Sequence, residues 1–313
     1  MLKLTNIEDI EFDYLRAQSF DLGIFASGYE RRSSFLIRNL DGVEIDNRIV
    51  FGFENYKDNK VRQENDKIYL SKSFSEVNIL SQGDSRLIYD ILIDLNTKQF
   101  SEKKSIKILI DYASMSRMWY SSILNFFRTL KNIEVEIFLN YCPGKYDDIE
   151  FIDYSYSEIN SLPSHEGSLS SNTKTMLVLG IGFSPYLIKS IIEEIEPNEI
   201  IGVIPIPSIN KDYDEKLKEI KELLARDIRN WVKCPVQSLT SIFRIYAEIT
   251  NEAIDSKDIL FLSVGPKILT MASLLVSQRF DQVTSLYLKT PKFEDKDVNE
   301  SGEFICNRIK YSP

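Results

Sequence analysis

The chain has 313 residues and a formal net charge of −9, with 43% hydrophobic and 27% charged residues. This length is typical of two domains of roughly 100 to 200 residues each. The apolar content is sufficient for ordered cores, which excludes an intrinsically disordered chain. The acidic balance excludes generic binding to duplex nucleic acid, because such binding needs a basic surface that displaces phosphate counterions, although it leaves room for a small basic pocket.

Hydropathy bears on where the protein resides. Met1 to Leu4 lack the basic start and the apolar run of a signal peptide. The longest apolar stretch, Met176 to Phe183, has the length of a strand, and no run of about 18 apolar residues occurs. We therefore expect a soluble, cytoplasmic protein that makes no membrane contact.

Cysteine and histidine usage argues against disulfides and metal sites. Cys142, Cys234 and Cys306 lie far apart and without Cys-x-x-Cys spacing, so we expect ordinary part-buried thiols. The single histidine, His165, lies in a polar stretch that is typical of a mobile connection. A His-based zinc site is excluded and a Ser-His-Asp triad is disfavoured, so we predict neither a metal nor a cofactor.

The first half of the chain alternates between short apolar runs and amphipathic stretches. Strands are predicted at Asp21–Gly28, Arg48–Phe53, Ile106–Asp111 and Val135–Leu139. Helical spacing follows the first strand at Phe35, Leu36, Ile37 and Leu40, and a further helix is predicted over Asp84–Leu95. This alternation is typical of a parallel sheet flanked by helices.

The second half repeats the same order of elements. Strands are predicted at Met176–Gly182, Glu199–Pro205, Ile259–Ser263 and Val283–Leu288, and helices at Leu187–Ile195, Asp212–Val232 and Ser238–Ile254. Equivalent turns in the two halves are separated by about 150 residues; the pairs are Gly28 with Gly182, Arg117 with Lys267, and Pro143 with Pro291. We interpret this repetition as a duplication, with chance similarity between generic βαβ units as the alternative.

The fold class predicted from this repetition is α/β, with two tandem Rossmann-like modules. Each module is expected to be a mainly parallel sheet flanked by helices, and the two modules to be related by a pseudo-two-fold duplication. Module 1 spans residues 1–154 and module 2 spans residues 175–313. Residues 155–174 are rich in Ser, Asn, Gly and Pro, which predicts a linker.

Candidate ligand-binding residues follow the first and fourth strands of each module, where strand order is expected to reverse. In module 1 they are Ser27, Gly28, Tyr29, Glu30, Arg31, Arg32, Ser114, Ser116 and Arg117. In module 2 they are Gly182, Phe183, Ser184, Gly265 and Lys267. Hydroxyls, cationic side chains and helix N-termini at one sheet edge predict an anion or phosphate site.

Each of these residues also has a purely structural interpretation. The serines are suitable helix N-caps, and Pro185 and Pro266 are suitable helix starts. Glu30 and Asp111 are expected to form ion pairs with neighbouring arginines rather than to act as bases or metal ligands. Neither Gly-x-Gly-x-x-Gly nor a P-loop motif occurs, which disfavours nicotinamide cofactors and P-loop hydrolysis.

With this plan the chain resembles the CRISPR-associated Rossmann-fold (CARF) sensor domains, in architecture more than in sequence. The resemblance covers about residues 20–145 and 175–292, with Ser27–Arg31 and Ser114–Arg117 as one pair of turns and Gly182–Ser184 and Val264–Lys267 as the other. Members of that family bind cyclic oligoadenylates across a two-fold interface between two such domains. The resemblance implies a nucleotide sensor in antiviral defence, and the chain departs from the usual plan of the family in having no appended nuclease or winged-helix effector. Partnership with a separate effector protein, sequestration of a nucleotide signal, and metal-free degradation of the signal as in ring nucleases are all compatible with the resemblance.

Three functions remain open from the sequence. The first is a sensor or regulatory subunit that binds a phosphate-bearing small molecule or nucleotide, including a cyclic oligonucleotide. The second is a metal-independent phosphodiesterase or nucleotide-modifying enzyme in which Ser114, Ser116 and Arg117 position a phosphate. The third is a scaffold subunit of a larger complex, because fold alone does not fix function. No catalytic residue is assigned.

Overall fold

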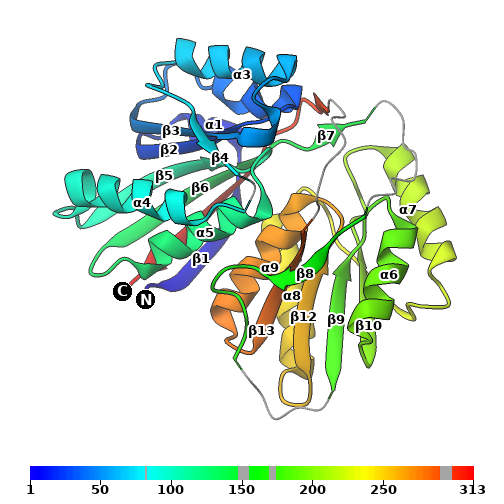
Figure 1. The fold of residues 1–313 in the computed structure, drawn as a ribbon. Helices are drawn as coiled ribbons and strands as arrows, with labels where there is room; N and C mark the ends of the chain where they lie inside the picture. The colour runs from blue at the N-terminus through cyan, green and yellow to red at the C-terminus, as the bar shows by residue number, and fades with distance from the viewer. Residues whose placement is uncertain (82, 147–154, 169–173, 290–297) are drawn as a thin grey trace. The chain divides into compact units, whose positions relative to one another are not determined.

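The computed structural model describes residues 1–81, 83–146, 155–168, 174–289 and 298–313 (Figure 1). The chain divides into two compact units, of which unit 1 comprises residues 1–146 and 295–313 and unit 2 comprises residues 147–294. Each unit contains one mainly parallel sheet flanked by helices. The predicted α/β class with two Rossmann-like modules is therefore confirmed.

Unit 1 is built on a seven-stranded sheet with the order β1-β15-β6-β5-β2-β3-β4. Its strands are β1 (Lys3–Ile10), β2 (Phe20–Ser27), β3 (Ile45–Phe53), β4 (Asn78–Leu80), β5 (Ser105–Asp111), β6 (Glu134–Tyr141) and β15 (Ile305–Ser312). Strands β2 to β6 are mutually parallel, whereas β15 pairs antiparallel with both β6 and β1. A separate two-stranded ribbon joins β7 (Gly144–Lys145) to β14 (Asn299–Glu300).

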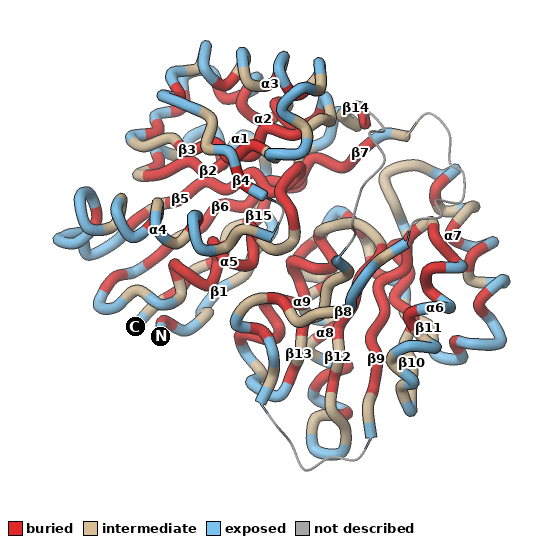
Figure 2. Tube along the Cα trace, viewed as in Figure 1, coloured by how far each residue is buried: buried red, intermediate tan, exposed pale blue. Residues whose placement is uncertain are grey.

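Helices and short helical turns connect the strands of unit 1. They are α1 (Phe12–Arg16), η1 (Arg31–Ser34), α2 (Phe35–Arg38), η2 (Glu54–Tyr56), α3 (Lys60–Ser71), α4 (Arg86–Leu95), η3 (Asn96–Phe100) and α5 (Arg117–Thr129). The central strand β2 is almost wholly buried, which is expected for a parallel strand with both faces covered. Figure 2 shows this contrast, since β2 and β5 are largely buried and the outer faces of α3 and α4 are exposed.

Unit 2 is built on a six-stranded sheet with the order β11-β10-β9-β12-β13-β8. Its strands are β8 (Glu158–Ser161), β9 (Thr175–Gly180), β10 (Glu199–Ile204), β11 (Asn230–Lys233), β12 (Asp258–Ser263) and β13 (Val283–Lys289), and its helices are α6 (Pro185–Ile195), α7 (Lys211–Leu223), α8 (Leu239–Ala253) and α9 (Lys267–Arg279). All its strands are parallel except β8, which pairs antiparallel with β13. The five parallel strands thus follow the same order as β2 to β6 in unit 1.

The predicted boundaries of the modules require correction. The C-terminal strand β15 lies between β1 and β6, so the end of the chain belongs to unit 1 and not to the module predicted at 175–313. Ile305, Ile309 and Tyr311 are buried on alternate positions of this strand, a period-2 pattern that marks a strand. The predicted linker at 155–174 contains β8, a polar edge strand that pairs through its backbone.

Local structure differs from the prediction at three further places. The helix predicted over Asp212–Val232 ends at Leu223, and β11 begins at Asn230. Leu224 and Ile228 continue the apolar spacing of the helix, but they are buried residues of the connection between the two elements. The helical pattern after β2 forms only η1 and α2. His165 is 3% exposed, with Nδ1 2.6 Å from Ser277 Oγ, so it is packed rather than mobile. Pro291 lies outside the described residues.

Candidate functional site

The predicted switch point of unit 1 lies between β2 and β5. These strands are adjacent and parallel, with Ile24 opposite Ile110, while β3 lies on the other side of β2. Strand order therefore reverses between them, as in other open α/β sheets whose ligands bind at this edge. The two following loops meet there, because a Cβ atom added at Gly28 would lie 3.3 Å from Ser114 Cβ.

The loop after β2 is fixed by buried hydroxyl and amide groups. Ser33 Oγ accepts a 2.7 Å hydrogen bond from Gly28 N and donates a 2.6 Å bond to Ala26 O. From α3, Asn65 Nδ2 donates to the carbonyl oxygens of Gly28 at 2.9 Å and Glu30 at 3.0 Å. Satisfied buried networks of this kind hold a backbone in one conformation, so the loop is pre-organised.

Arg32 and Glu30 form an ion pair inside the same loop. Arg32 Nε and Nη2 donate to the two carboxylate oxygens of Glu30 at 2.9 Å and 3.2 Å, and Nη1 donates to Cys142 O at 3.1 Å. Arg32 is 5% exposed. Burial lowers the pKa of Arg32, but Glu30 and the phenols of Tyr141 and Tyr146 outweigh it and the pKa is raised. The predicted pairing of Glu30 with an arginine is thereby confirmed.

Asp111, the other carboxylate considered from the sequence, accepts hydrogen bonds from neighbouring backbone and side-chain groups. Its Oδ1 accepts hydrogen bonds from Ala113 N and Asn140 Nδ2, both at 3.2 Å. These bonds hold the loop that follows β5. Ser114 in that loop donates a 3.4 Å hydrogen bond from Oγ to Glu30 Oε2, which connects the two loops through side chains.

Several predicted ligand-binding residues of unit 1 already serve the fold. Ser27 Oγ donates to Asp66 Oδ1 at 2.5 Å, and Ser116 is the N-cap of α5, where Oγ accepts from Trp119 N at 3.1 Å. Arg31, the first residue of η1, is exposed, and Arg117, the first residue of α5, is partly exposed. The basic residues at the loop ends therefore differ from buried Arg32 in being reached by solvent.

Tyr29 lies against Tyr56 from the turn after β3, with ring centroids 4.3 Å apart. Burial, followed by the neighbouring Glu30 carboxylate, raises the pKa of Tyr29 far above its ordinary value. The phenol is therefore neutral throughout the physiological range. A neutral, partly exposed ring beside the Gly28 turn presents an aromatic surface rather than a charge.

The corresponding edge of unit 2 is organised by glycine. Strands β9 and β12 are adjacent and parallel, with Gly180 opposite Ser263. A Cβ atom at Gly182 would lie 2.2 Å from Val264 O, and one at Gly265 would lie 2.2 Å from Ile181 O. The two loops thus touch backbone to backbone, which only glycine allows.

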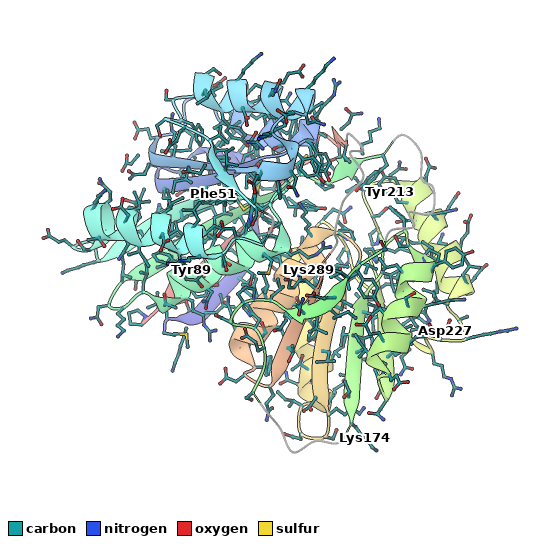
Figure 3. All side chains as sticks on the ribbon, viewed as in Figure 1. Phe51, Tyr89, Lys174, Tyr213, Asp227 and Lys289 are labelled. Atoms are coloured by element: carbon teal, nitrogen blue, oxygen red, sulfur yellow. The ribbon has the colours of Figure 1, made fainter. Side chains whose placement is uncertain are left out.

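The remaining predicted residues of unit 2 flank this contact. Ser184 is the buried N-cap residue of α6, followed by Pro185 in the first turn. The Phe183 ring contacts Tyr213 with centroids 5.5 Å apart. Tyr213 lies on α7 and is labelled in Figure 3. Lys267 is the partly exposed first residue of α9, directly after Pro266. Lys267 therefore places a cation at a helix start on this sheet edge.

Sequence reasoning missed the contribution of α3. Arg62, Asn65 and Tyr69 are the buried residues of this helix, and they occupy positions i, i+3 and i+7. Arg62 Nε donates to Asp66 Oδ1 at 2.7 Å, and Nη1 donates to Phe53 O at 2.8 Å. The buried face of α3 is largely polar, so the periodicity of apolar residues did not reveal it. The available signal was the helical spacing of Arg62, Asn65 and Tyr69.

The described residues offer neither a metal-binding cluster nor a membrane-spanning helix. No group of three or more His, Cys, Asp or Glu side chains among them is placed to hold a metal ion. None of the helices that the structure describes combines the length and apolarity needed to cross a membrane. The three cysteines are buried and form no disulfide with one another.

Comparisons with known proteins give little further information. No protein-family model matches the chain, and no curated protein matches its sequence. One solved structure found by fold comparison is phosphoethanolamine N-methyltransferase 1 from Haemonchus contortus, in complex with phosphoethanolamine and S-adenosylhomocysteine. It has 10% sequence identity and a TM-score of 0.22, over 96% of this chain and 90% of that chain. Similarity at this level identifies no family for the chain.

Proposed function

We propose that the chain binds a phosphate-bearing nucleotide at the switch point of unit 1 and acts as a sensor or regulatory subunit. The observation that carries this proposal is the contact between the two loops after β2 and β5, where Gly28 meets Ser114. This edge is where open α/β sheets bind ligands. Each loop then leads into a helical segment that begins with an arginine, Arg31 or Arg117.

The chemistry of these loops suits an anion. The N-terminus of α5, a helix of 13 residues, presents backbone N–H groups and the positive end of its dipole at this edge. Arginine adds a planar donor group that matches phosphate geometry. The buried Glu30–Arg32 pair neutralises itself, so we assign it the role of fixing the loop.

Binding is better supported than catalysis by the same residues. Ser116, which the phosphodiesterase hypothesis would use, caps α5, and Glu30 is held by two nitrogens of Arg32. The resemblance to CARF domains makes cyclic oligonucleotides the first ligands to test and antiviral regulation the context in which to test them. A separate effector protein would then carry the output.

The direct test is a thermal-shift and calorimetric screen of the full chain. Mononucleotides, dinucleotides, cyclic dinucleotides and cyclic oligoadenylates are tested against the wild type, Arg117→Ala and Arg31→Ala. A ligand that binds only the native state raises the midpoint of unfolding. We expect a shift that both substitutions reduce and that Arg226→Ala, the loss of an exposed arginine in unit 2, leaves unchanged. A screen in which no nucleotide shifts the wild type would refute the proposal.

A further inference from the structure

Four aromatic side chains form a continuous series of ring contacts beside the switch point of unit 1. Tyr29 contacts Tyr56 with centroids 4.3 Å apart, and Tyr56 contacts Phe53 edge to face at 6.2 Å. Phe53 in turn stacks on Trp119, with centroids 4.1 Å apart and planes at 21°. The rings come from the loop after β2, from η2, from the end of β3 and from α5. Residues distant in sequence thus form one aromatic surface.

This series runs from the core to the solvent. Trp119 is fully buried, contacts fully buried Phe51 at 6.1 Å, and donates from Nε1 to Ser81 O at 3.0 Å, which satisfies the polar atom of the indole. Phe53, Tyr56 and Tyr29 are partly exposed. The inner end therefore serves as an anchor, and the outer end is a Tyr29–Tyr56 pair that solvent reaches.

Polar side chains of α3 hold this outer end in place. Asn65, 3% exposed, binds the carbonyl oxygens of Gly28 and Glu30, the two neighbours of Tyr29. Arg62, fully buried, binds the carbonyl oxygen of Phe53. Burial of a guanidinium carries a large desolvation free energy. If the cluster only filled space, apolar residues would fill it without that cost.

The space for Arg62 is itself provided by glycine. A Cβ atom at Gly52 would lie 1.9 Å from Arg62 Nη2. The charge of Arg62 is balanced by Asp66, which also accepts the hydroxyl hydrogen bond of Ser27. This charge pair, with a fully buried arginine and a partly exposed aspartate, therefore fixes the end of β2 and the end of β3 together, and it holds the aromatic rings of these segments in place.

We infer that the Tyr29–Tyr56 pair is a stacking subsite for the nucleobase of the ligand, an inference that rests on the proposed phosphate site. Tyr29 directly follows Gly28, and Trp119 lies two residues after Arg117, so the first and last rings of the series lie in the same two chain segments as Arg31 and Arg117. Aromatic faces stack on every base through π contacts, whereas a phosphate needs charge and N–H groups. The ligand class this predicts is a nucleoside phosphate, not a sugar phosphate or an inorganic anion.

The experiment separates the base from the phosphate. The best nucleotide from the screen, ribose 5-phosphate and pyrophosphate are titrated calorimetrically into the full-length wild type, Tyr29→Leu, Tyr56→Leu and Tyr56→Phe. Tyr186→Leu removes a 62% exposed tyrosine of unit 2 and is the matched control. Ring-current shifts of the base protons in NMR spectra report stacking directly, and thermal unfolding of each variant without ligand verifies its fold.

We expect each leucine variant to weaken nucleotide binding roughly 10- to 100-fold, to abolish the upfield shifts of the base protons, and to leave pyrophosphate binding unchanged. Tyr56→Phe and Tyr186→Leu should bind as the wild type does. Equal affinity for the nucleotide and for ribose 5-phosphate, or base shifts that persist in both leucine variants, would overturn the stacking subsite while leaving the phosphate site intact. Failure of every ligand to bind would overturn the proposed function and this inference with it.

Discussion

The five parallel strands of units 1 and 2 share one order, but the units differ at the point where that order reverses. In unit 1 the loops after the first and fourth parallel strands meet through side chains, with Ser114 bonded to Glu30 and Glu30 paired with buried Arg32. In unit 2 the equivalent loops meet through backbone at Gly182 and Gly265. The same order of parallel strands thus supports two different kinds of contact between loops. The candidate site lies at the contact between polar side chains in unit 1.

Unit 1 also contains a second ion pair with a buried arginine. Arg62 pairs with Asp66 in unit 1 with no exposure of the arginine side chain. The pairs that the described part of unit 2 contains, such as Lys257–Glu199 and Lys289–Glu158, are partly or largely exposed. Exposed pairs contribute little to stability, whereas breaking a buried pair strands a charge. Substitutions that break an ion pair should therefore destabilise unit 1 more than unit 2.

The largest expected effect comes from breaking the Arg32–Glu30 pair of unit 1. Arg32→Met leaves the Glu30 carboxylate, 14% exposed, without its counter-charge, and should lower the free energy of unfolding of unit 1 by about 4 kcal/mol. Urea unfolding measures this, because Trp119 lies in unit 1 and Trp231 in unit 2 as the two tryptophans of the chain. Single-tryptophan variants then report each unit separately.

Two further variants test the cause of that loss. Adding Glu30→Gln to Arg32→Met should restore more than half of it, since no unpaired carboxylate remains. Lys289→Met, which breaks an exposed pair of unit 2, should leave the Trp231 transition where it is in the wild type. If the double variant is as unstable as Arg32→Met alone, lost packing and not the stranded charge explains the effect.

The second prediction concerns the glycine contact of unit 2. Gly182→Ala places a Cβ atom 2.2 Å from a backbone oxygen that cannot move aside, and should destabilise unit 2 by about 3 kcal/mol. Gly28→Ala in unit 1 meets side-chain atoms alone, Ser114 Cβ at 3.3 Å and Ser33 Oγ at 3.6 Å being the nearest, and its effect should stay within about 1 kcal/mol. Trp231 and Trp119 fluorescence follow the respective transitions in urea.

Gly83→Ala is the control for the glycine substitutions, because an added Cβ atom there meets nothing within 4 Å. It should leave both transitions unchanged. Equal losses for Gly182→Ala and Gly28→Ala would contradict the distinction between a backbone contact in unit 2 and a side-chain contact in unit 1.

The sequence predicted the central strands well for a physical reason. Each is a short apolar run buried on both faces, as in β2 and β9, and periodicity detects such runs directly. The switch point followed from topology rules, which place the first and fourth strands side by side. The assignment of Gly28 and Ser114 to adjacent loops needed nothing more than those rules.

What the sequence left hidden depends on contacts across long separations. The pairing of β15 with β6 places Ile309 opposite Ile137, and the composition near the C-terminus does not indicate that partner strand. Arg62 and Asn65 read as surface residues of a polar helix, although Gly52 opens the space that buries one of them. The ligand-binding role of the fourteen predicted residues stays a prediction, which the binding experiments test.

The smallest predicted effect distinguishes two serines that look alike in sequence. Ser116 caps α5 through a hydrogen bond from Trp119 N, whereas Ser184, the N-cap residue of α6, makes no side-chain cap bond within the described structure. Ser116→Ala should therefore lower the free energy of unfolding of unit 1 by about 1 kcal/mol. Ser184→Ala should change the free energy of unfolding of unit 2 by no more than a few tenths of a kcal/mol. Ser116→Asp, which restores an accepting oxygen and favours the helix dipole, should recover the stability that Ser116→Ala loses. Equal losses at Ser116 and Ser184 would show that the capping bond is not what separates the two sites.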